Sequence, residues 1–249
     1  MTEVKRVLVR TFMLLVVAAA LLALLAGCVI ARGSGNVVDD ERAASGFDRI
    51  EVRGSGELVV EQGTREQVTV RADDNLQRYI RTEVKGRTLV ISIGSGSMPV
   101  SLWPSEPIRY IVRLKDLAGL VLSGSTEASA DSLKAEELRI EVSGSGSVRM
   151  KDLDANQLTY ELSGSGSATM SGSADDQSVR ISGSGSYDAA DLKSKRTTVD
   201  ISGSASAEIW TEETLDIDLS GSGSIEYYGS PRVDQNVSGS GSVKGLGEK

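Results

Sequence analysis

Residues 141–149 read EVSGSGSVR, and five later stretches repeat this pattern with small changes. Alternating glycine and serine is also the usual composition of an unstructured linker. The first serine of each copy, however, recurs at near-constant intervals, at Ser123, Ser143, Ser163, Ser182, Ser202, Ser220 and Ser238. Such a period predicts a repeat architecture with about 19 residues in each unit.

Each unit alternates between apolar and polar side chains, which is typical of a β-strand. The second unit shows this in two interleaved sets, Leu138, Ile140, Val142, Gly144, Gly146, Val148 and Met150 against Arg139, Glu141, Ser143, Ser145, Ser147 and Arg149. The alternation passes unbroken through the glycine-serine tract. We therefore expect an ordered path, with serines pointing outward and glycines pointing inward.

The predicted fold is all-β, a single-stranded parallel β-solenoid, because a unit of this length is too short for a propeller blade and has no helical pattern. Equivalent residues of successive coils then stack in columns. One inward column is aliphatic throughout, with Leu122, Val142, Leu162, Ile181, Ile201, Leu219 and Val237. A divergent eighth copy at residues 50–60 is in phase, whereas IGSGSM at residues 93–98 is out of phase and is expected to form a loop.

The first glycine of the motif is present in all eight copies, whereas the second is replaced by Thr126 and Ala205. We expect the first position to require either a positive φ or a close approach that only glycine allows. These structural glycines are Gly54, Gly124, Gly144, Gly164, Gly183, Gly203, Gly221 and Gly239.

The N-terminus has the pattern of an export signal, since Lys5, Arg6 and Arg10 precede an apolar run of about 20 residues. A run of this length could also remain as a membrane-spanning anchor. Residues 25–28, LAGC, resemble the lipobox of bacterial lipoproteins. That resemblance implies cleavage before Cys28, acylation of its thiol, and an extracytoplasmic protein anchored to the cell membrane or the outer membrane.

We divide the chain into a signal peptide at 1–27, a lipidated cysteine with a flexible spacer at 28–46, and one domain at 47–245. The regular repeats occupy residues 120–245. Residues 47–119 are less regular, and we expect them to cap the solenoid with short strands at VTVRA, IRTEV and TLVISI and a hairpin turn at residues 85–87.

Composition excludes several functions. The net charge is −8, and cleavage before Cys28 would remove three basic residues and one acidic residue, giving −10. Such acidity disfavours binding to nucleic acid. The chain has no histidine, which removes the commonest general base and metal ligand, and Cys28 is its only cysteine. We expect no cofactor beyond weakly bound Ca²⁺.

FDRIEVRGSGELVVEQG at residues 47–63, LVLSGST at 120–126 and the later SGSGS units resemble the bacterial head GIN domain family, whose description is "putative auto-transporter adhesin". The resemblance covers residues 47–245. It implies a right-handed single-stranded parallel β-helix on an exported, often lipid-anchored protein, and it supplies no catalytic residues.

Two outward columns are candidate binding surfaces. Carboxylates stack at Glu141, Glu161, Asp200 and Asp218, interrupted by Arg180, and could hold Ca²⁺ weakly or form a solvated charged face. Trp210 and Tyr228 should be neighbours on adjacent coils, where stacked rings suit a sugar or a protein, unless a turn buries them.

The predicted function is a lipid-anchored, non-catalytic binding or structural module of the cell envelope, adhesin-like, with an envelope glycan or surface protein as partner. The alternative is a polysaccharide-active lyase or hydrolase, which requires convergent carboxylates in a concave groove. Adjacent acidic pairs occur at residues 73–74, 175–176 and 212–213. Because adjacent strand residues face opposite ways, these pairs do not by themselves form such a site.

Overall fold

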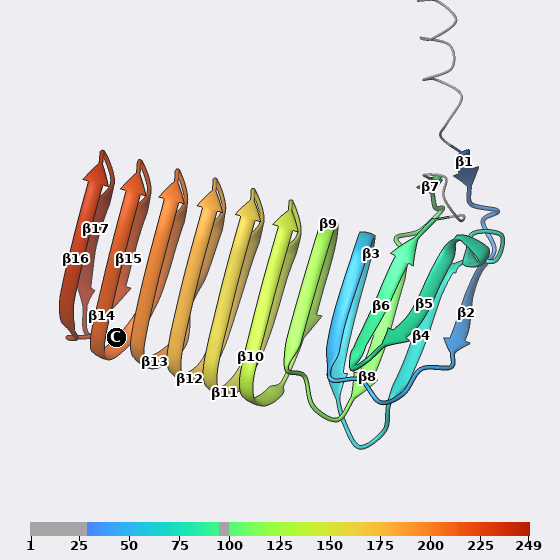
Figure 1. The fold of residues 1–249 in the computed structure, drawn as a ribbon, viewed down its shortest axis with the longest axis horizontal. Helices are drawn as coiled ribbons and strands as arrows, with labels where there is room; N and C mark the ends of the chain where they lie inside the picture. Colours follow the sequence, from blue (N-terminus) through green and yellow to red (C-terminus); the bar gives the residue numbers. More distant parts are fainter. Residues whose placement is uncertain (1–28, 95–99) are drawn as a thin grey trace, which may run out of the picture.

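A computed structural model describes residues 29–94 and 100–249, most of which lie in strands (Figure 1). The N-terminal part contains β1 Val29–Arg32, β2 Val37–Arg42, β3 Arg49–Gln62, β4 Gln67–Asp73, the 3₁₀ turn η1 Gln77–Tyr79, β5 Ile80–Lys85, β6 Thr88–Ile93, β7 Val100–Trp103 and β8 Arg109–Leu114. The regular part contains β9 Gly119–Ala130, β10 Leu133–Gly144, β11 Ser147–Gly164, β12 Ser167–Gly183, β13 Ser186–Gly203, β14 Ser206–Gly221, β15 Ser224–Tyr228, β16 Arg232–Gly239 and β17 Ser242–Gly247.

The regular part is a β-solenoid in which one long strand forms almost a whole coil, as the sequence period predicts. Strands β11 to β14 are 16 to 18 residues long and pair in parallel with their neighbours. Strands β10 to β14 each end at the SGSGS corner, where two residues such as Ser145 and Gly146 separate one strand from the next. Figure 1 shows these coils side by side from β9 to β17.

The SGSGS corners stay in register along the whole stack, with Ser143 opposite Ser123 and Ser163, and Gly144 opposite Gly124 and Gly164. Register shifts instead fall on the far side of the coil, for example between Met150 and Leu153. The small variation in length from one repeat to the next is therefore absorbed away from the corner.

The aliphatic column forms the centre of the core. Val142 lies opposite Leu122 and Leu162, and the column continues through Ile181, Ile201 and Leu219, all at most 2% exposed. Val237 continues the register but is 40% exposed, because β16 belongs to the last coil.

The predicted inward direction of the glycines is correct for the second glycine of the corner and wrong for the first. Gly146 is buried, whereas Gly144 is half-exposed and lies directly against the glycine of the preceding coil. All eight first glycines have positive φ, from 111° at Gly124 to 147° at Gly54. A Cβ on Gly144 would lie 2.6 Å from the carbonyl oxygen of Gly124, which accepts a hydrogen bond from the Ser145 N–H at 2.9 Å. Both reasons that we proposed for glycine therefore apply.

The irregular part caps one end of the solenoid, as predicted. One edge of β3 pairs in register with β9, with Gly54 opposite Gly124. The other edge of β3 pairs with β6 and β8. Strands β4, β5 and β2 then add antiparallel pairs. The predicted hairpin joins β5 and β6 with Gly86 at φ 62°. The loop predicted at residues 93–98 falls mainly on residues 95–99, outside the described part.

The prediction of a flexible spacer at residues 28–46 is wrong for the residues that the structure describes. Strand β1 pairs in parallel with β7, and β2 pairs antiparallel with β4. These partners lie far away in sequence, so the local pattern gave no sign of them. Cys28 and the apolar run before it lie outside the described residues. Within the described ranges, no helix is long and apolar enough to cross a membrane.

Candidate functional site

Trp210 and Tyr228 are neighbours on adjacent coils, as the sequence predicts, because they pair in the register of β14 with β15. Both side chains are half-buried. The Trp210 side chain points outward, as predicted, because its sequence neighbours Ile209 and Thr211 are both buried. The pair therefore lies on the outer face of the solenoid and is not covered by a turn.

Two lysines lie over these rings. The Lys193 Nζ is 5.5 Å from the Trp210 ring centroid, and the Lys249 Nζ is 5.5 Å from Trp210 and 5.1 Å from Tyr228. Lys249 is held there by the carbonyl oxygen of Ala190 at 2.6 Å and by Asp191 at 2.5 Å. The ring faces thus attract cations, and a ligand that stacks on them must displace Lys249.

The carboxylate column has the predicted register, with Glu141 opposite Glu161, and Asp200 opposite Asp218. Arginines fill the space between several of its members. Arg139 contacts Glu141 at 2.6 Å and Glu161 at 2.7 Å, and Arg180 contacts Glu161 at 2.9 Å and Asp200 at 3.4 Å. Among residues 29–94 and 100–249, no group of three acidic or cysteine residues is placed to hold a metal ion. This geometry favours the solvated, ion-paired face over a Ca²⁺ site.

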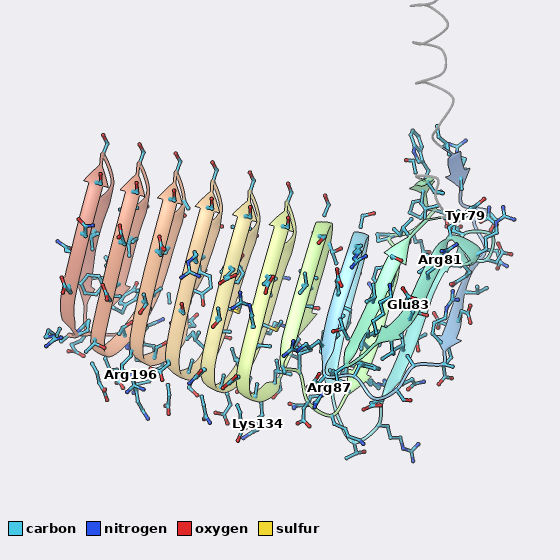
Figure 2. The ribbon with its side chains drawn as sticks, in the orientation of Figure 1. Tyr79, Arg81, Glu83, Arg87, Lys134 and Arg196 are labelled. Atoms are coloured by element: carbon cyan, nitrogen blue, oxygen red, sulfur yellow. The ribbon has the colours of Figure 1, made fainter. Side chains whose placement is uncertain are left out.

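The adjacent acidic pairs are held by neighbouring side chains and do not converge on one cleft. Asp175 pairs with Lys195 at 2.7 Å, and Asp176 with Arg196 at 2.5 Å. Figure 2 shows Arg196 and Lys134 projecting from the same corner of the coils, on the side opposite the SGSGS motif. The hydrogen bonds and charge of Arg196 lower the pKa of Asp176 below its usual value despite partial burial.

The third acidic pair, Glu212 and Glu213, lies close to the Trp210 ring through Lys193. Glu212 pairs with Lys193 at 2.8 Å, and Glu213 lies 3.9 Å from Arg196.

Asp73 is fully buried and ties the N-terminal segment to the domain. Its carboxylate accepts hydrogen bonds from the Gly35 N–H at 2.8 Å, the Ser105 N–H at 2.9 Å and the Ser105 hydroxyl at 2.6 Å. Asp74 accepts from the Ser34 hydroxyl at 2.5 Å and the Asn36 amide at 3.0 Å. This pair therefore serves to hold residues 34–36 in place.

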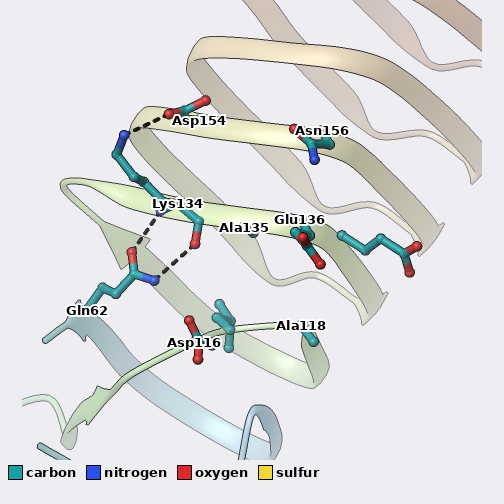
Figure 3. Close-up of a pocket in the computed structure, with 10 residues that line it drawn as sticks. Gln62, Asp116, Ala118, Lys134, Ala135, Glu136, Asp154 and Asn156 are labelled. Atoms are coloured by element: carbon teal, nitrogen blue, oxygen red, sulfur yellow. Dashed lines mark hydrogen bonds and ion pairs between the residues drawn. The ribbon is translucent and has the colours of Figure 1, made fainter. Parts of the chain in front are cut away.

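A concave groove lies where the end of β3, the segment between β8 and β9, and strands β10 and β11 meet (Figure 3). Its volume is about 760 Å³. Gln62 braces its wall, donating to the carbonyl oxygens of Lys115 and Lys134 and accepting from the Lys134 N–H. The polar lining residues are Gln62, Asp116, Lys134, Glu136, Glu137, Asp154 and Asn156.

Our sequence reasoning missed this groove. Asp116, Glu136 and Asn156 follow one another at the coil period, so their alignment was available as a signal. The chemistry of the groove is limited, because Asp154 is already paired with Lys134 at 2.9 Å. An acidic groove that is open to solvent suits a cationic or hydroxyl-rich ligand.

A capped stack of parallel coils with ion-paired faces defines this chain as a β-solenoid protein. The family model for "Putative auto-transporter adhesin, head GIN domain" matches residues 46–231, so the chain belongs to the head GIN domain family. A search of curated proteins finds no match.

Solved structures support the fold. A "putative lipid binding protein" from Parabacteroides distasonis is 26% identical, with a TM-score of 0.74 over 87% of this chain and 99% of that one. A "putative adhesin" from Bacteroides fragilis is 23% identical, with a TM-score of 0.81 over 87% and 100%. Another from Parabacteroides merdae is 23% identical, with a TM-score of 0.68 over 88% and 99%.

Proposed function

We propose that this chain is an adhesin-like, non-catalytic binding module of the cell envelope, exported and anchored through lipidated Cys28. Its family and the names of its structural neighbours support an adhesive role outside the cytoplasm. The lipobox-like LAGC and the basic, apolar N-terminus support the anchor.

The observation that carries this proposal is the aromatic pair of Trp210 and Tyr228 on the outer face of a rigid solenoid. Half-buried rings supported by a packed core can bind the apolar face of a sugar at little entropic cost. The lysines above them favour a glycan that carries acidic groups, such as uronate or phosphate, because the ligand then replaces the Lys249 contact with Asp191.

The test is binding of the purified protein to envelope glycans. We expect Trp210→Ala to abolish binding and to leave the far-ultraviolet circular dichroism spectrum intact. Tyr79→Ala is the matched control, since it also removes a half-buried aromatic ring with a cation above it, but from the cap. Equal binding by both variants and the wild type would refute the assignment of the aromatic pair.

The anchor is tested separately by intact mass. We expect the membrane-extracted protein to begin at Cys28 and to carry acyl chains, and Cys28→Ser to prevent both changes. A wild-type chain that keeps residues 1–27 would contradict lipidation.

A polysaccharide-active enzyme is the second candidate, and the acidic groove of Figure 3 is the observation that favours it. Glu136 and Asp116 would then supply the acid and base. We expect no depolymerisation of envelope polysaccharides. Activity that disappears in Glu136→Gln would establish the enzyme instead.

A further inference from the structure

The β1–β7 pair forms a small ribbon with two different faces. Ile30 pairs with Ser101, Ala31 with Leu102, and Arg32 with Trp103. Paired residues of parallel strands share a face. Ala31 and Leu102 therefore lie on one side of the ribbon, and the opposite side carries Ile30, Arg32, Ser101 and Trp103. Ala31 is buried and Leu102 packs against the core, so the opposite face points outward.

This outer face is unusually apolar for an exposed surface. Three large hydrophobic side chains are at least 40% exposed among the described residues, and two of them, Ile30 at 68% and Trp103 at 60%, lie here. Arg32, the register partner of Trp103, is exposed, and no ion pair occurs for it within the described part of the chain. An exposed tryptophan, isoleucine and arginine together match the chemistry of a lipid headgroup region.

The position of the face in the chain identifies its occupant. Ile30 follows Cys28 by two residues, which is at most about 7 Å of extended chain. The apolar run of residues 11–26 ends two residues before Cys28. Whether Cys28 is acylated or the run remains uncleaved, the membrane surface lies within reach of Ile30.

The ribbon is joined firmly to the domain, so a contact there would orient the whole rod. The Asn75 side-chain amide donates to the Arg32 carbonyl oxygen at 2.8 Å. Asp73 binds both Gly35, which follows β1, and Ser105, which follows β7. The direction of the solenoid axis is therefore fixed relative to the ribbon, without a flexible joint in the described residues from Ile30 onward.

We infer that the outer face of the β1–β7 ribbon, Ile30, Arg32, Ser101 and Trp103, docks on the lipid headgroup region and sets the orientation of the rod on the membrane. The indole and the isoleucine side chain enter the boundary between headgroups and acyl chains, and the Arg32 guanidinium contacts lipid phosphate. The inference rests on the proposed membrane anchor, because a protein of net charge −8 has little other attraction to a membrane.

The chain offers a direct test because its only tryptophans are Trp103 and Trp210. The full chain is reconstituted in phosphatidylcholine vesicles with or without bromine on the acyl chains, which quenches nearby indole emission. In Trp210→Phe, where Trp103 is the reporter, we expect brominated lipid to remove most of the emission. In Trp103→Phe, where Trp210 reports from the regular coils, we expect little loss. Circular dichroism of both variants checks the fold.

The possible results separate docking from anchoring. Vesicle-bound protein whose Trp103 emission is unquenched, or quenched no more than that of Trp210, overturns the docking inference and leaves the anchor standing. Quenching of Trp103 in a chain whose intact mass shows no acyl group supports docking and overturns lipidation of Cys28. A chain that does not float with the vesicles overturns both.

Discussion

At the scale of single residues, the corner of each coil depends on one glycine more than on the other. Gly144 combines a φ of 117° with a Cβ position 2.6 Å from the Gly124 carbonyl oxygen. At Gly146 the Cβ position lies 2.9 Å from the Thr126 carbonyl oxygen, and φ is not positive. Thr126 and Ala205 show that the second position accepts a side chain after a small local adjustment.

We expect Gly144→Ala to lower the free energy of unfolding by about 2 kcal/mol, the usual cost of one strained backbone residue, and Gly146→Ala to lower it by clearly less. Urea denaturation of the two variants measures the difference. Equal losses would mean that crowding alone, and not the positive φ, explains the first glycine.

Two buried tyrosines in contact differ in how their hydroxyl groups are satisfied. The rings of Tyr160 and Tyr187 are 5.0 Å apart. The Tyr187 hydroxyl accepts a hydrogen bond from the Gln177 amide at 2.7 Å, and Gln177 accepts in turn from Ser194. The Tyr160 hydroxyl is buried and has no hydrogen-bond partner in the described structure.

Tyr160→Phe should therefore be neutral or stabilising, since it removes an unsatisfied polar atom, whereas Tyr187→Phe should cost about 1–2 kcal/mol by leaving the Gln177 amide without its acceptor. Thermal denaturation of both variants tests this. A loss in Tyr160→Phe as large as in Tyr187→Phe would show that its hydroxyl has a partner in solution.

At the scale of elements, stacked strands place residues at equivalent positions of successive coils about 4.8 Å apart. Each outward column of charged side chains must therefore balance its own charge. Arg180 does this on β12, between Glu161 of β11 and Asp200 of β13. Its contacts are largely exposed, which limits their contribution to the free energy of unfolding to less than about 1 kcal/mol.

We expect Arg180→Gln to lower the melting temperature slightly, more at low salt than at high salt. Millimolar Ca²⁺ should restore it, because Asp200 then lacks its ion pair and Glu161 keeps only Arg139. The wild type should not respond to Ca²⁺. A rise in the melting temperature of the wild type would support the weak metal column instead.

The N-terminal strands depend on a carboxylate. Burial raises the pKa of Asp73, but hydrogen bonds from Ser105 and the Gly35 N–H outweigh it and hold the pKa below its usual value. A group whose pKa is lowered by folding stabilises the fold above its unfolded pKa of about 3.9, and this contribution is lost as the pH falls through the folded value.

Residues 29–46 should accordingly become sensitive to an acid-active protease below about pH 4, where Asp73 takes up a proton once the segment has detached from it. Asp73→Asn should show the same sensitivity at neutral pH with a neutral protease. Asp39→Asn, an exposed change on the neighbouring β2, is the control and should resist cleavage. Equal cleavage of the two variants would contradict the role of Asp73.

At the scale of the whole molecule, the two ends of the solenoid are different. Strands β6 and β8 cover the end at β3, and antiparallel strands follow them. Strands β16 and β17 pair with β14 and β15 and have no partner on their other edge among the described residues. In a stack where each coil contacts only its neighbours, stability falls toward an uncapped end.

Amide hydrogen exchange should therefore be fastest, among the regular coils, in residues 232–247, and slowest in β11 to β13. Exchange measured by mass spectrometry under native conditions would show this gradient. Uniform protection along the rod would indicate that a partner or a second copy covers the last coil in solution.

The sequence alone determined the coil period, the aliphatic column, the special role of the first glycine and the neighbouring positions of Trp210 and Tyr228. Each of these follows from alternation within a strand and from repetition at a fixed interval, and both are properties of the linear chain.

Tertiary structure alone decided the pairing of β1 with β7, the hydrogen bond from Gly35 to Asp73 and the position of Lys249 over the rings. These contacts join segments of different sequence that lie far apart along the chain, and no period relates them. The first two contacts form where the irregular strands close one end of the stack, and the third forms where Lys249 reaches β13 and β14. All three are properties of the packed molecule and not of any one segment.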